Sequence, residues 1–394
     1  MKKTFLLTFL CSSFLLSGCW SSREIEELGL NVGIALDKGD KVAENMGRVE
    51  ETPDSSGFLF TNTYQYVNIS AVPSGSKDGG SGQKQYVNIS EVGGTNHQII
   101  REVSLREENP IMFQHTKVIV VSGDLLKDTS MRKLLDLFLR DNEMRLSCIV
   151  LVTKGSAKEV LNLKDPSVIP SLRLVGIGDN VYRSTKILKP MTLTRLQGNI
   201  YSNNSYLIQN VVSKSGEVRF SGAAVFSGKT NKLIGYLKEE DLTGVTMITG
   251  EAKGGIIKVN EGKKGRQRDF EIKTIKSTIT PKVLNGKISF HINIAAQGRL
   301  SENWFLSHRP INQVLTQSEK EIKKSMEQRL TQALKMTQKK YKADVIGLGE
   351  RLRIKYPRTW EKVKSNWDST FANVPVTYSV EVNITDYGYN DPKS

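Results

Sequence analysis

The amino-terminal segment constrains the fold of this 394-residue chain most, because it predicts where the chain folds and which residues stay outside the folded body. Two lysines, Lys2 and Lys3, precede an apolar stretch at residues 4–15, an order and length typical of a signal peptide for export. The stretch is too short to span a bilayer as a permanent helix. It ends in Leu-Ser-Gly-Cys at residues 16–19, the lipobox pattern, in which small residues fit a peptidase cleft and the thiol accepts lipid before cleavage. Residues 1–18 are therefore predicted to be a lipoprotein signal peptide that is removed.

Cys19 is the one modification site that the sequence predicts, as an N-palmitoyl and S-diacylglycerol cysteine at the mature amino terminus. The alternative is an ordinary signal peptide that a cysteine follows by chance. The positive region, the apolar region and the lipobox occur together in the right order, which favours the lipoprotein. Because each buried methylene contributes about 0.8 kcal/mol, two or more acyl chains hold a protein at a membrane nearly permanently. We therefore expect a chain held by lipid at the outer face of the cell membrane.

Charge and cysteine content narrow the possible partners. Removal of residues 1–18 leaves 376 of the 394 residues and lowers the formal charge from +15 to +13, because two lysines are lost. Export argues against nucleic acid as a partner. The excess of basic residues therefore has two interpretations: attraction to anionic lipid headgroups or wall polymers, or a solvated surface without a partner. Cys11 leaves with the signal peptide, and Cys148 lies in an apolar run, where we expect a buried small hydrophobe. No internal disulfide is predicted, as in many exported proteins of Gram-positive bacteria.

Residues 19–199 predict an amino-terminal domain of α/β type. Short helices are expected after Ser21 (a Ser-x-x-Glu capping box), Thr95, Asp128 or Thr129, and Ser156, and strands at residues 30–36, 58–70, 117–121 and 149–152. Met131, Leu134, Leu135 and Phe138 recur at the spacing of one apolar helix face between the last two strands. Strand, helix and strand in this order predict a parallel pair with a right-handed crossover. Pro166, Pro170 and Pro190 then mark a looser stretch.

The sequence Gln-Tyr-Val-Asn-Ile-Ser occurs twice, at residues 65–70 and 85–90, on either side of a stretch rich in Gly and Ser. Two copies are too few for a repeat architecture. A small internal duplication of a strand is the interpretation we prefer.

The pattern changes near residue 200, where we place a middle β-hairpin domain at residues 200–268 and a carboxy-terminal α+β domain at residues 269–394. Strands at residues 222–226 and 232–237 predict one hairpin, residues 250–269 a linker, and strands at residues 271–280 and 287–296 a second hairpin around Asn285-Gly286. A long helix is expected at residues 317–346, and the chain closes with a strand at residues 374–385. That helix is amphipathic and lysine-rich, so it either lies on a membrane surface or, as we prefer, packs on a sheet.

Residues suited to chemistry are scattered. The four histidines, His97, His115, His291 and His308, have no spacing that suits zinc, and neither a G-x-S-x-G elbow nor a Walker loop occurs. The Gly-x-Gly pairs at residues 176–178 and 347–349 lack the further glycine of a dinucleotide site and are expected to be turns or helix ends. The acidic run at residues 239–241 is expected to be a solvated turn. We therefore predict no enzyme, no catalytic residue, no cofactor and no metal, and favour a binding or assembly role.

Four patches in collinear order carry a family resemblance. They are residues 19–29 (CWSSREIEELG), residues 115–120 (HTKVIV), residues 222–226 with 232–237, Glu239 and Gly244, and a final group of Gly347–Gly349, Trp360, Trp367, Phe371 and residues 374–376. Together they resemble the Ger(x)C family, the lipoprotein C subunits of spore germinant receptors. Ser21 or Ser22 stands where that family commonly has an acidic residue, and the duplicated strand is not expected of the family.

The resemblance implies an elongated, multidomain α+β protein with three domains. In this fold class a mixed sheet with helices comes first, and antiparallel strands packed with one long helix come last. The resemblance also implies a lipid-anchored, non-enzymatic subunit on the spore inner membrane, with an integral-membrane A subunit and a transporter-like B subunit as partners in nutrient detection. The main alternative is a lipid-anchored solute-binding protein that feeds a transporter, which needs two similar lobes around a cleft; a wall-modifying enzyme comes third.

Overall fold

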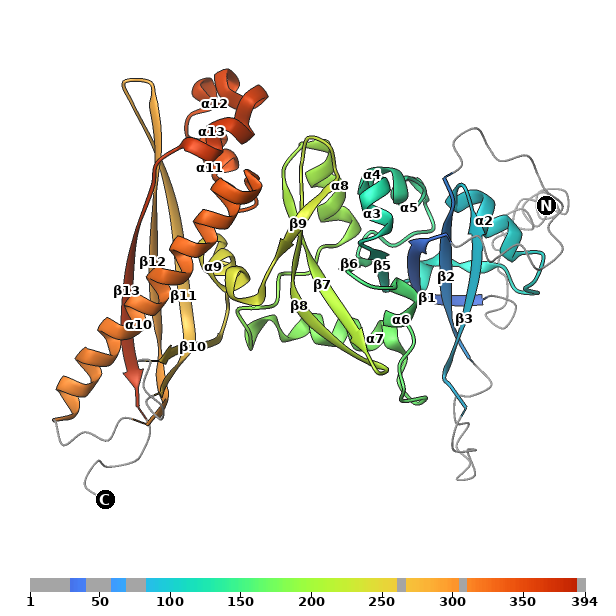
Figure 1. Ribbon diagram of the computed structural model, residues 1–394, viewed down its shortest axis with the longest axis horizontal. Helices are drawn as coiled ribbons and strands as arrows, with labels where there is room; N and C mark the ends of the chain where they lie inside the picture. Colours follow the sequence, from blue (N-terminus) through green and yellow to red (C-terminus); the bar gives the residue numbers. More distant parts are fainter. Residues whose placement is uncertain (1–28, 40–57, 69–82, 261–266, 305–309, 388–394) are drawn as a thin grey trace, which may run out of the picture.

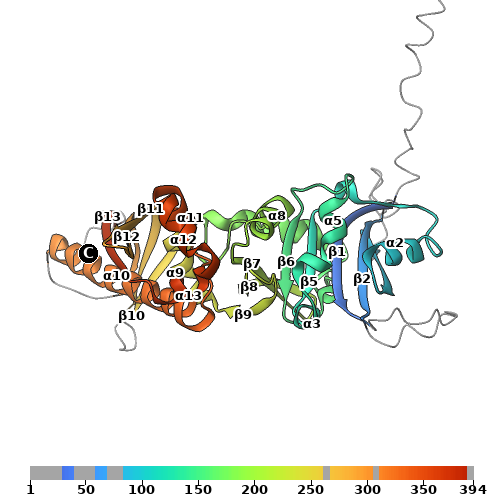
Figure 2. The same cartoon turned by 90° about the horizontal axis from the view of Figure 1, so that it is seen from above.

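The computed structural model describes residues 29–39, 58–68, 83–260, 267–304 and 310–387. Cys19, the capping box at Ser21 and His308 lie outside these described residues. Figures 1 and 2 show an elongated molecule in which a large sheet with its helices and a smaller sheet with one long helix follow one another along the long axis. The predicted α+β class with several regions is confirmed.

The large sheet has the strand order β3-β2-β1-β5-β6-β7-β8-β9, and β4 also pairs with β1. Its strands are β1 (Gly29–Lys38), β2 (Phe60–Val67), β3 (Tyr86–Gly93), β4 (Ile111–Met112), β5 (Val118–Ser122), β6 (Ile149–Thr153), β7 (Tyr206–Lys214), β8 (Glu217–Phe226) and β9 (Leu233–Leu237). The central strands β1, β5, β6 and β7 are parallel, and antiparallel hairpins flank them on both sides. The predicted parallel pair is confirmed, and all residues of β5 and β6 are buried, as continuous apolar strands between two layers should be.

The helices of this part begin largely where the sequence indicates. They are α2 (Asn96–Val103), α3 (Leu125–Asp128), α4 (Met131–Leu134), α5 (Asp136–Arg140), α6 (Ala157–Val160), α7 (Pro170–Gly178) and α8 (Leu193–Tyr201). Thr95 and Ser156 cap α2 and α6 as predicted, and the predicted apolar face beginning at Met131 is buried. The expected cap at Asp128 or Thr129 was wrong, because the Ser130 hydroxyl accepts the N–H of Lys133. The prediction of a looser stretch around Pro166, Pro170 and Pro190 was also wrong, because Pro170 begins α7. Proline is tolerated at the first position of a helix, where the N–H that it lacks would have no partner within the helix.

Strands β7, β8 and β9 continue the large sheet beyond residue 200: β7 pairs with β6 of the amino-terminal region, and the predicted middle hairpin, β8 and β9, follows β7 in the same sheet. The side chains of Leu207, Val225 and Leu237 nevertheless join the core that lies against the small sheet. We keep the division at residues 199/200 and 268/269 as a proposal.

The small sheet has the order β10-β11-β12-β13, with β10 (Gly255–Asn260), β11 (Gln267–Leu284), β12 (Lys287–Asn303) and β13 (Val376–Asp386). The predicted linker at residues 250–269 was wrong, because β10 lies within it and buries Ile257 and Val259. Asn285 and Gly286 form the predicted tight turn, both with positive φ (50° and 75°). The last strand departs from the antiparallel pattern and pairs parallel with β12, which the long helical connection between them allows.

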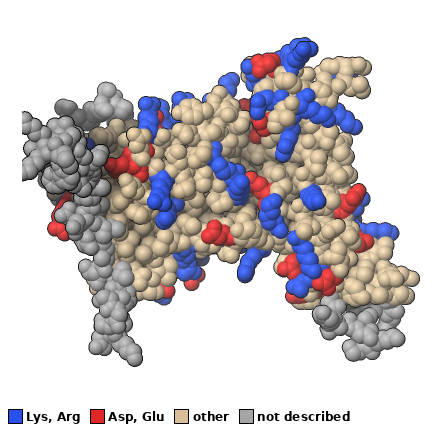
Figure 3. Space-filling model, turned by 180° about the vertical axis from the view of Figure 1, so that it is seen from behind, with Lys and Arg blue, Asp and Glu red and all other residues tan. Residues whose placement is uncertain are grey.

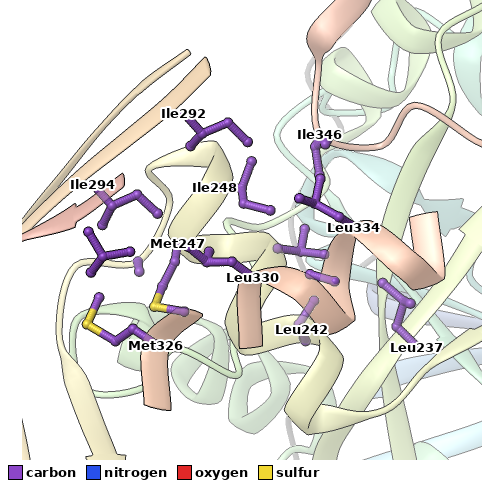
Figure 4. Packing of buried hydrophobic residues seen from close by; sticks show 14 of the residues in the cluster. Leu237, Leu242, Met247, Ile248, Ile292, Ile294, Met326, Leu330, Leu334 and Ile346 are labelled. Carbon is purple, nitrogen blue, oxygen red and sulfur yellow. The ribbon is translucent and has the colours of Figure 1, made fainter. Parts of the chain in front are cut away.

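The long helix α10 (Ile311–Leu334) continues into a π-helical turn at Lys335–Tyr341, labelled η6. Its apolar face, which includes Ile322, Met326 and Leu330, is buried against the small sheet. The preferred interpretation of this helix is therefore confirmed, and its lysines at positions 320, 323 and 324 are exposed on the opposite face. Figure 4 shows how α9 (Glu239–Thr249) fills the space between α10 and β12.

Candidate functional site

The residues of the predicted middle signature converge where the large sheet meets the small one. We call this region the junction and define it as the strand β9, the helix α9, the facing part of α10 and Tyr341. The side chains of α9 are buried almost along its whole length, and they belong to the largest hydrophobic core. In Figure 4, Met247 lies beside Met326 and Leu330 of α10, and Ile248 lies toward Ile292 of β12. The junction is thus a packed core that joins two sheets.

Tyr341 connects the end of the π-helical turn to β9. Its hydroxyl donates a hydrogen bond to the Tyr236 carbonyl (2.7 Å) and accepts one from the Tyr236 N–H (3.2 Å). The Tyr341 ring lies directly over Gly235, where an added Cβ would be 2.3 Å from a ring carbon. One phenol therefore satisfies both backbone groups of an edge-strand residue, as a neighbouring strand would.

The side chain of Tyr236 extends in the other direction, toward the ends of β5 and β6. Lys154 lies over its ring with Nζ 4.6 Å from the centroid, and Gly123 is close enough that an added Cβ would be 2.2 Å from the hydroxyl oxygen. Burial, followed by the charge of Asp124, raises the pKa of Tyr236 to about 12. Tyr236 thereby contacts the large sheet with its ring and the small-sheet region with its backbone.

Helix α9 crosses α10 at close distance at Gly244. A Cβ at this position would lie 2.3 Å from the Arg329 carbonyl oxygen and 2.7 Å from the Ala333 Cβ. Near the start of α9, Asp241 accepts the N–H of Lys238 (3.1 Å) and the side-chain amide of Gln332 (3.1 Å). Close contact and hydrogen bonds therefore fix the two helices in one relative position.

The acidic run at residues 239–241 is not the solvated turn that we predicted. It forms the first turn of α9, where negative charge is favourable, and Asp241 is buried. Glu239 accepts hydrogen bonds from Lys186 and Arg219, both at 3.0 Å. Burial alone would raise the pKa of Glu239, but these two cations lower it overall. The residues therefore serve helix capping and local charge pairing.

The final signature residues surround one buried carboxylate. Asp344 accepts hydrogen bonds from the N–H groups of Leu348 (3.0 Å) and Gly349 (2.6 Å) and from the Trp367 indole (2.8 Å). Burial raises the pKa of Asp344 despite these hydrogen bonds, which act in the opposite direction. Gly349 has no room for a side chain, because a Cβ would be 2.7 Å from the Trp367 indole nitrogen. Trp360 packs edge-on against Trp367 with centroids 5.2 Å apart.

Asp344 and the two tryptophans thus form a cluster of polar and aromatic groups. These three hydrogen bonds to Asp344 come from within the fold, and its carboxyl group is buried away from solvent. The Gly-x-Gly pairs are at helix ends as expected, with Gly178 closing α7 and Gly347 preceding α11 (Leu348–Lys355).

Other candidate residues stay apart. His97, His115 and His291 lie on different elements, and within the described ranges no three His, Cys, Asp or Glu residues are grouped so as to hold a metal ion. Cys148 is 1% exposed, which confirms the prediction of a buried residue, and burial raises the pKa of its thiol.

A shallow polar hollow of about 350 Å³ lies beside η6 and is lined by Gln338, Lys339, Lys342, Asn366, Asp368, Ser369, Ala372 and Asn373. In the part of the chain that the structure describes, no helix is both long and apolar enough to cross a membrane.

The duplicated segments pair with each other. Strands β2 and β3 are antiparallel, so that Gln65 faces Asn88 and Val67 faces Tyr86. The Gln65 amide donates to Asn88 Oδ1 (3.0 Å), and both side chains donate to the Leu161 carbonyl. Leu161 directly follows α6, so these bonds tie the hairpin to the end of that helix. The duplication thus builds one hairpin at the edge of the large sheet.

Comparisons with known proteins agree with this architecture. Residues 21–212 match the family described as "Spore germination protein N-terminal domain", and residues 221–388 match "Spore germination B3/ GerAC like, C-terminal". Relatives in Bacillus subtilis (strain 168) include spore germination protein YndF, 44% identical over 94% of this chain and 93% of the relative, and spore germination protein A3, 30% identical over 98% of each. The crystal structure of the GerBC protein superposes with a TM-score of 0.60 at 26% identity, covering 84% of this chain and 95% of that one.

The chain therefore belongs to the GerAC family of spore germination proteins, which confirms the resemblance to the Ger(x)C family. The middle and final groups of signature residues lie in the junction and around Asp344, whereas residues 115–120 lead into β5 of the large sheet. Asp344, Gln332 and Tyr341 were not singled out from the sequence, since nothing in their spacing reveals a partner far along the chain.

Proposed function

We propose that this protein is a lipid-anchored, non-enzymatic C subunit of a nutrient germinant receptor, required for the spore's germination response. The observation that carries the proposal is membership of a spore germination family together with a lipobox that ends in Cys19. The lipid on Cys19 would hold the protein at the outer face of the spore inner membrane. Its partners would be the integral-membrane A and B subunits.

The geometry supports a scaffold more than a binding pocket or an active site. The buried carboxyl groups beside the signature residues, those of Asp344 and Asp241, form hydrogen bonds within the fold. The hollow beside η6 is open to solvent and lined mostly by polar residues, unlike the enclosed pockets lined by apolar and aromatic side chains that bind small molecules. Two sheets joined through a packed core at the junction suit a subunit that positions other proteins at a membrane.

The anchor is tested by Cys19→Ala, with Cys11→Ala as the matched control in the same signal peptide. We expect Cys19→Ala to leave the precursor unprocessed, to release it from the spore membrane fraction and to abolish the germination response. Cys11→Ala should behave as the unsubstituted protein. Mass spectrometry of the mature amino terminus should show acyl chains on Cys19. A bare amino terminus, or full membrane retention of Cys19→Ala, would refute the anchor.

The receptor role is tested separately by pull-down of tagged protein from detergent-solubilised spore membranes. Recovery of two integral-membrane receptor subunits supports the role. Tight binding of a nutrient to the purified chain alone, together with recovery of transporter components, would instead support the solute-binding alternative.

A further inference from the structure

The end of the small sheet carries a concentrated basic surface. Helix α11 and helix α12 (Pro357–Val363) lie there beside the turn between β11 and β12 (Figure 1). Residues 348–366 contain six exposed Lys or Arg residues and two Glu residues, a net charge of +4 (6 − 2). Two more exposed lysines, Lys282 and Lys287, flank the neighbouring turn. We call these residues the basic crest; its side chains gather at one corner in the view from behind (Figure 3).

The negative charges of the crest are already paired. Glu350 binds Arg353 at 2.6 Å, and Glu361 binds Lys364 at 2.5 Å. The remaining cations, Arg351, Lys355, Arg358 and Lys362, form no salt bridge with a carboxylate of the described ranges. The crest therefore presents positive charge that the fold itself does not neutralise.

Two large apolar side chains project from the same surface. Ile354 is 63% exposed between Arg353 and Lys355, and Leu284 is 74% exposed at the tip of the β11–β12 turn. Trp367 beneath them is turned inward, since it is only 9% exposed and packs on Phe290. Isolated apolar side chains among cations suit insertion between lipid headgroups. The two side chains stand apart from each other among cations, unlike the clustered anchors that dominate protein–protein interfaces.

We propose that the basic crest rests on the anionic surface of the lipid bilayer. This inference rests on the proposed anchoring at a membrane, and it adds a second point of contact far along the chain from Cys19. The occupant is the bilayer headgroup layer, with Lys355, Arg358 and Lys362 against lipid phosphates and Ile354 between them. An elongated body held at two points would have a defined orientation relative to its membrane neighbours.

The test uses the mature chain, residues 19–394, with Cys19→Ser so that no acyl chain contributes. Its partitioning is measured by co-sedimentation with phosphatidylglycerol-containing vesicles and with phosphatidylcholine vesicles. The crest variant carries Lys355→Gln, Arg358→Gln and Lys362→Gln. The matched control carries Lys320→Gln, Lys323→Gln and Lys324→Gln on α10, which removes the same charge from another exposed helix face.

We expect binding to phosphatidylglycerol vesicles that weakens with added salt. The crest variant should bind about 100-fold more weakly, since each lysine or arginine near an anionic surface contributes about fivefold. The α10 control should bind nearly as well as the parent chain. Equal losses in both variants, or no binding to anionic vesicles, would overturn the proposal. An acidic protein partner that binds the crest in the absence of vesicle binding would overturn it as well. Because Cys19 is absent throughout, these outcomes are independent of the anchor test.

Discussion

The close crossing of α9 and α10 predicts that Gly244→Ala destabilises the protein, although alanine is the better helix former. The added methyl group would lie 2.3 Å from the Arg329 carbonyl oxygen, a backbone atom that cannot move without shifting α10. Overpacking of this kind costs about 1–3 kcal/mol. Alanine in place of glycine gains up to about 1 kcal/mol in a helix. We therefore expect a net loss of about 1–2 kcal/mol in the free energy of unfolding.

Gly198→Ala is the matched control, because Gly198 lies in α8 with no atom within 4 Å of an added Cβ. This substitution should stabilise the protein by about 0.5–1 kcal/mol. Urea denaturation followed by tryptophan fluorescence suits the comparison, since Trp360 and Trp367 belong to the same core as α9. If Gly244→Ala proved as stable as Gly198→Ala, the reasoning that the junction is held by close helix contact would be refuted.

Three further predictions each concern one side chain. Tyr341→Phe should lower the free energy of unfolding by about 1–3 kcal/mol, because both backbone groups of Tyr236 lose their partner; the urea midpoint measures this loss. Burial raises the pKa of Asp344 above its usual 3.8. The folded protein therefore binds the carboxyl proton more tightly than the unfolded chain does. As a result, the contribution of Asp344 to stability is greatest at low pH and falls as the pH rises through the raised pKa. The stability difference between the parent and Asp344→Asn should therefore fall with rising pH, and a difference independent of pH would contradict the shift. Cys148 should resist thiol reagents in a chain with Cys11→Ser and Cys19→Ser until denaturant is added, and rapid labelling of the folded chain would show that the thiol is accessible.

Features encoded by local pattern could be predicted from the sequence. The apolar helix face at Met131 and the tight turn at Asn285-Gly286 each depend on residues close together in the chain. The parallel pairing of β5 and β6 follows from the order strand, helix, strand and needs no distant contact.

Features that depend on distant partners could not be predicted in this way. The glycine-rich composition around β10 suggested a linker, but pairing with β11 and burial of Ile257 override that composition. The role of Asp241 depends on Gln332, which lies on another helix far along the chain. The same holds for the parallel pairing of β13, whose partner precedes the whole helical segment.

The duplicated strand separates the two effects most clearly, because the same local sequence occurs twice in one molecule. Residues 65–67 of the first copy end β2 and residues 86–90 of the second copy begin β3, yet their tyrosines differ in surroundings. The Tyr86 hydroxyl donates to the Leu163 carbonyl (3.2 Å), whereas the buried Tyr66 hydroxyl has no hydrogen-bond partner among the described residues. Burial raises the pKa of Tyr66, because the charged form would lack solvation there. Local sequence therefore favours strand at both tyrosines, and the position of each strand in the sheet determines what its side chains contact.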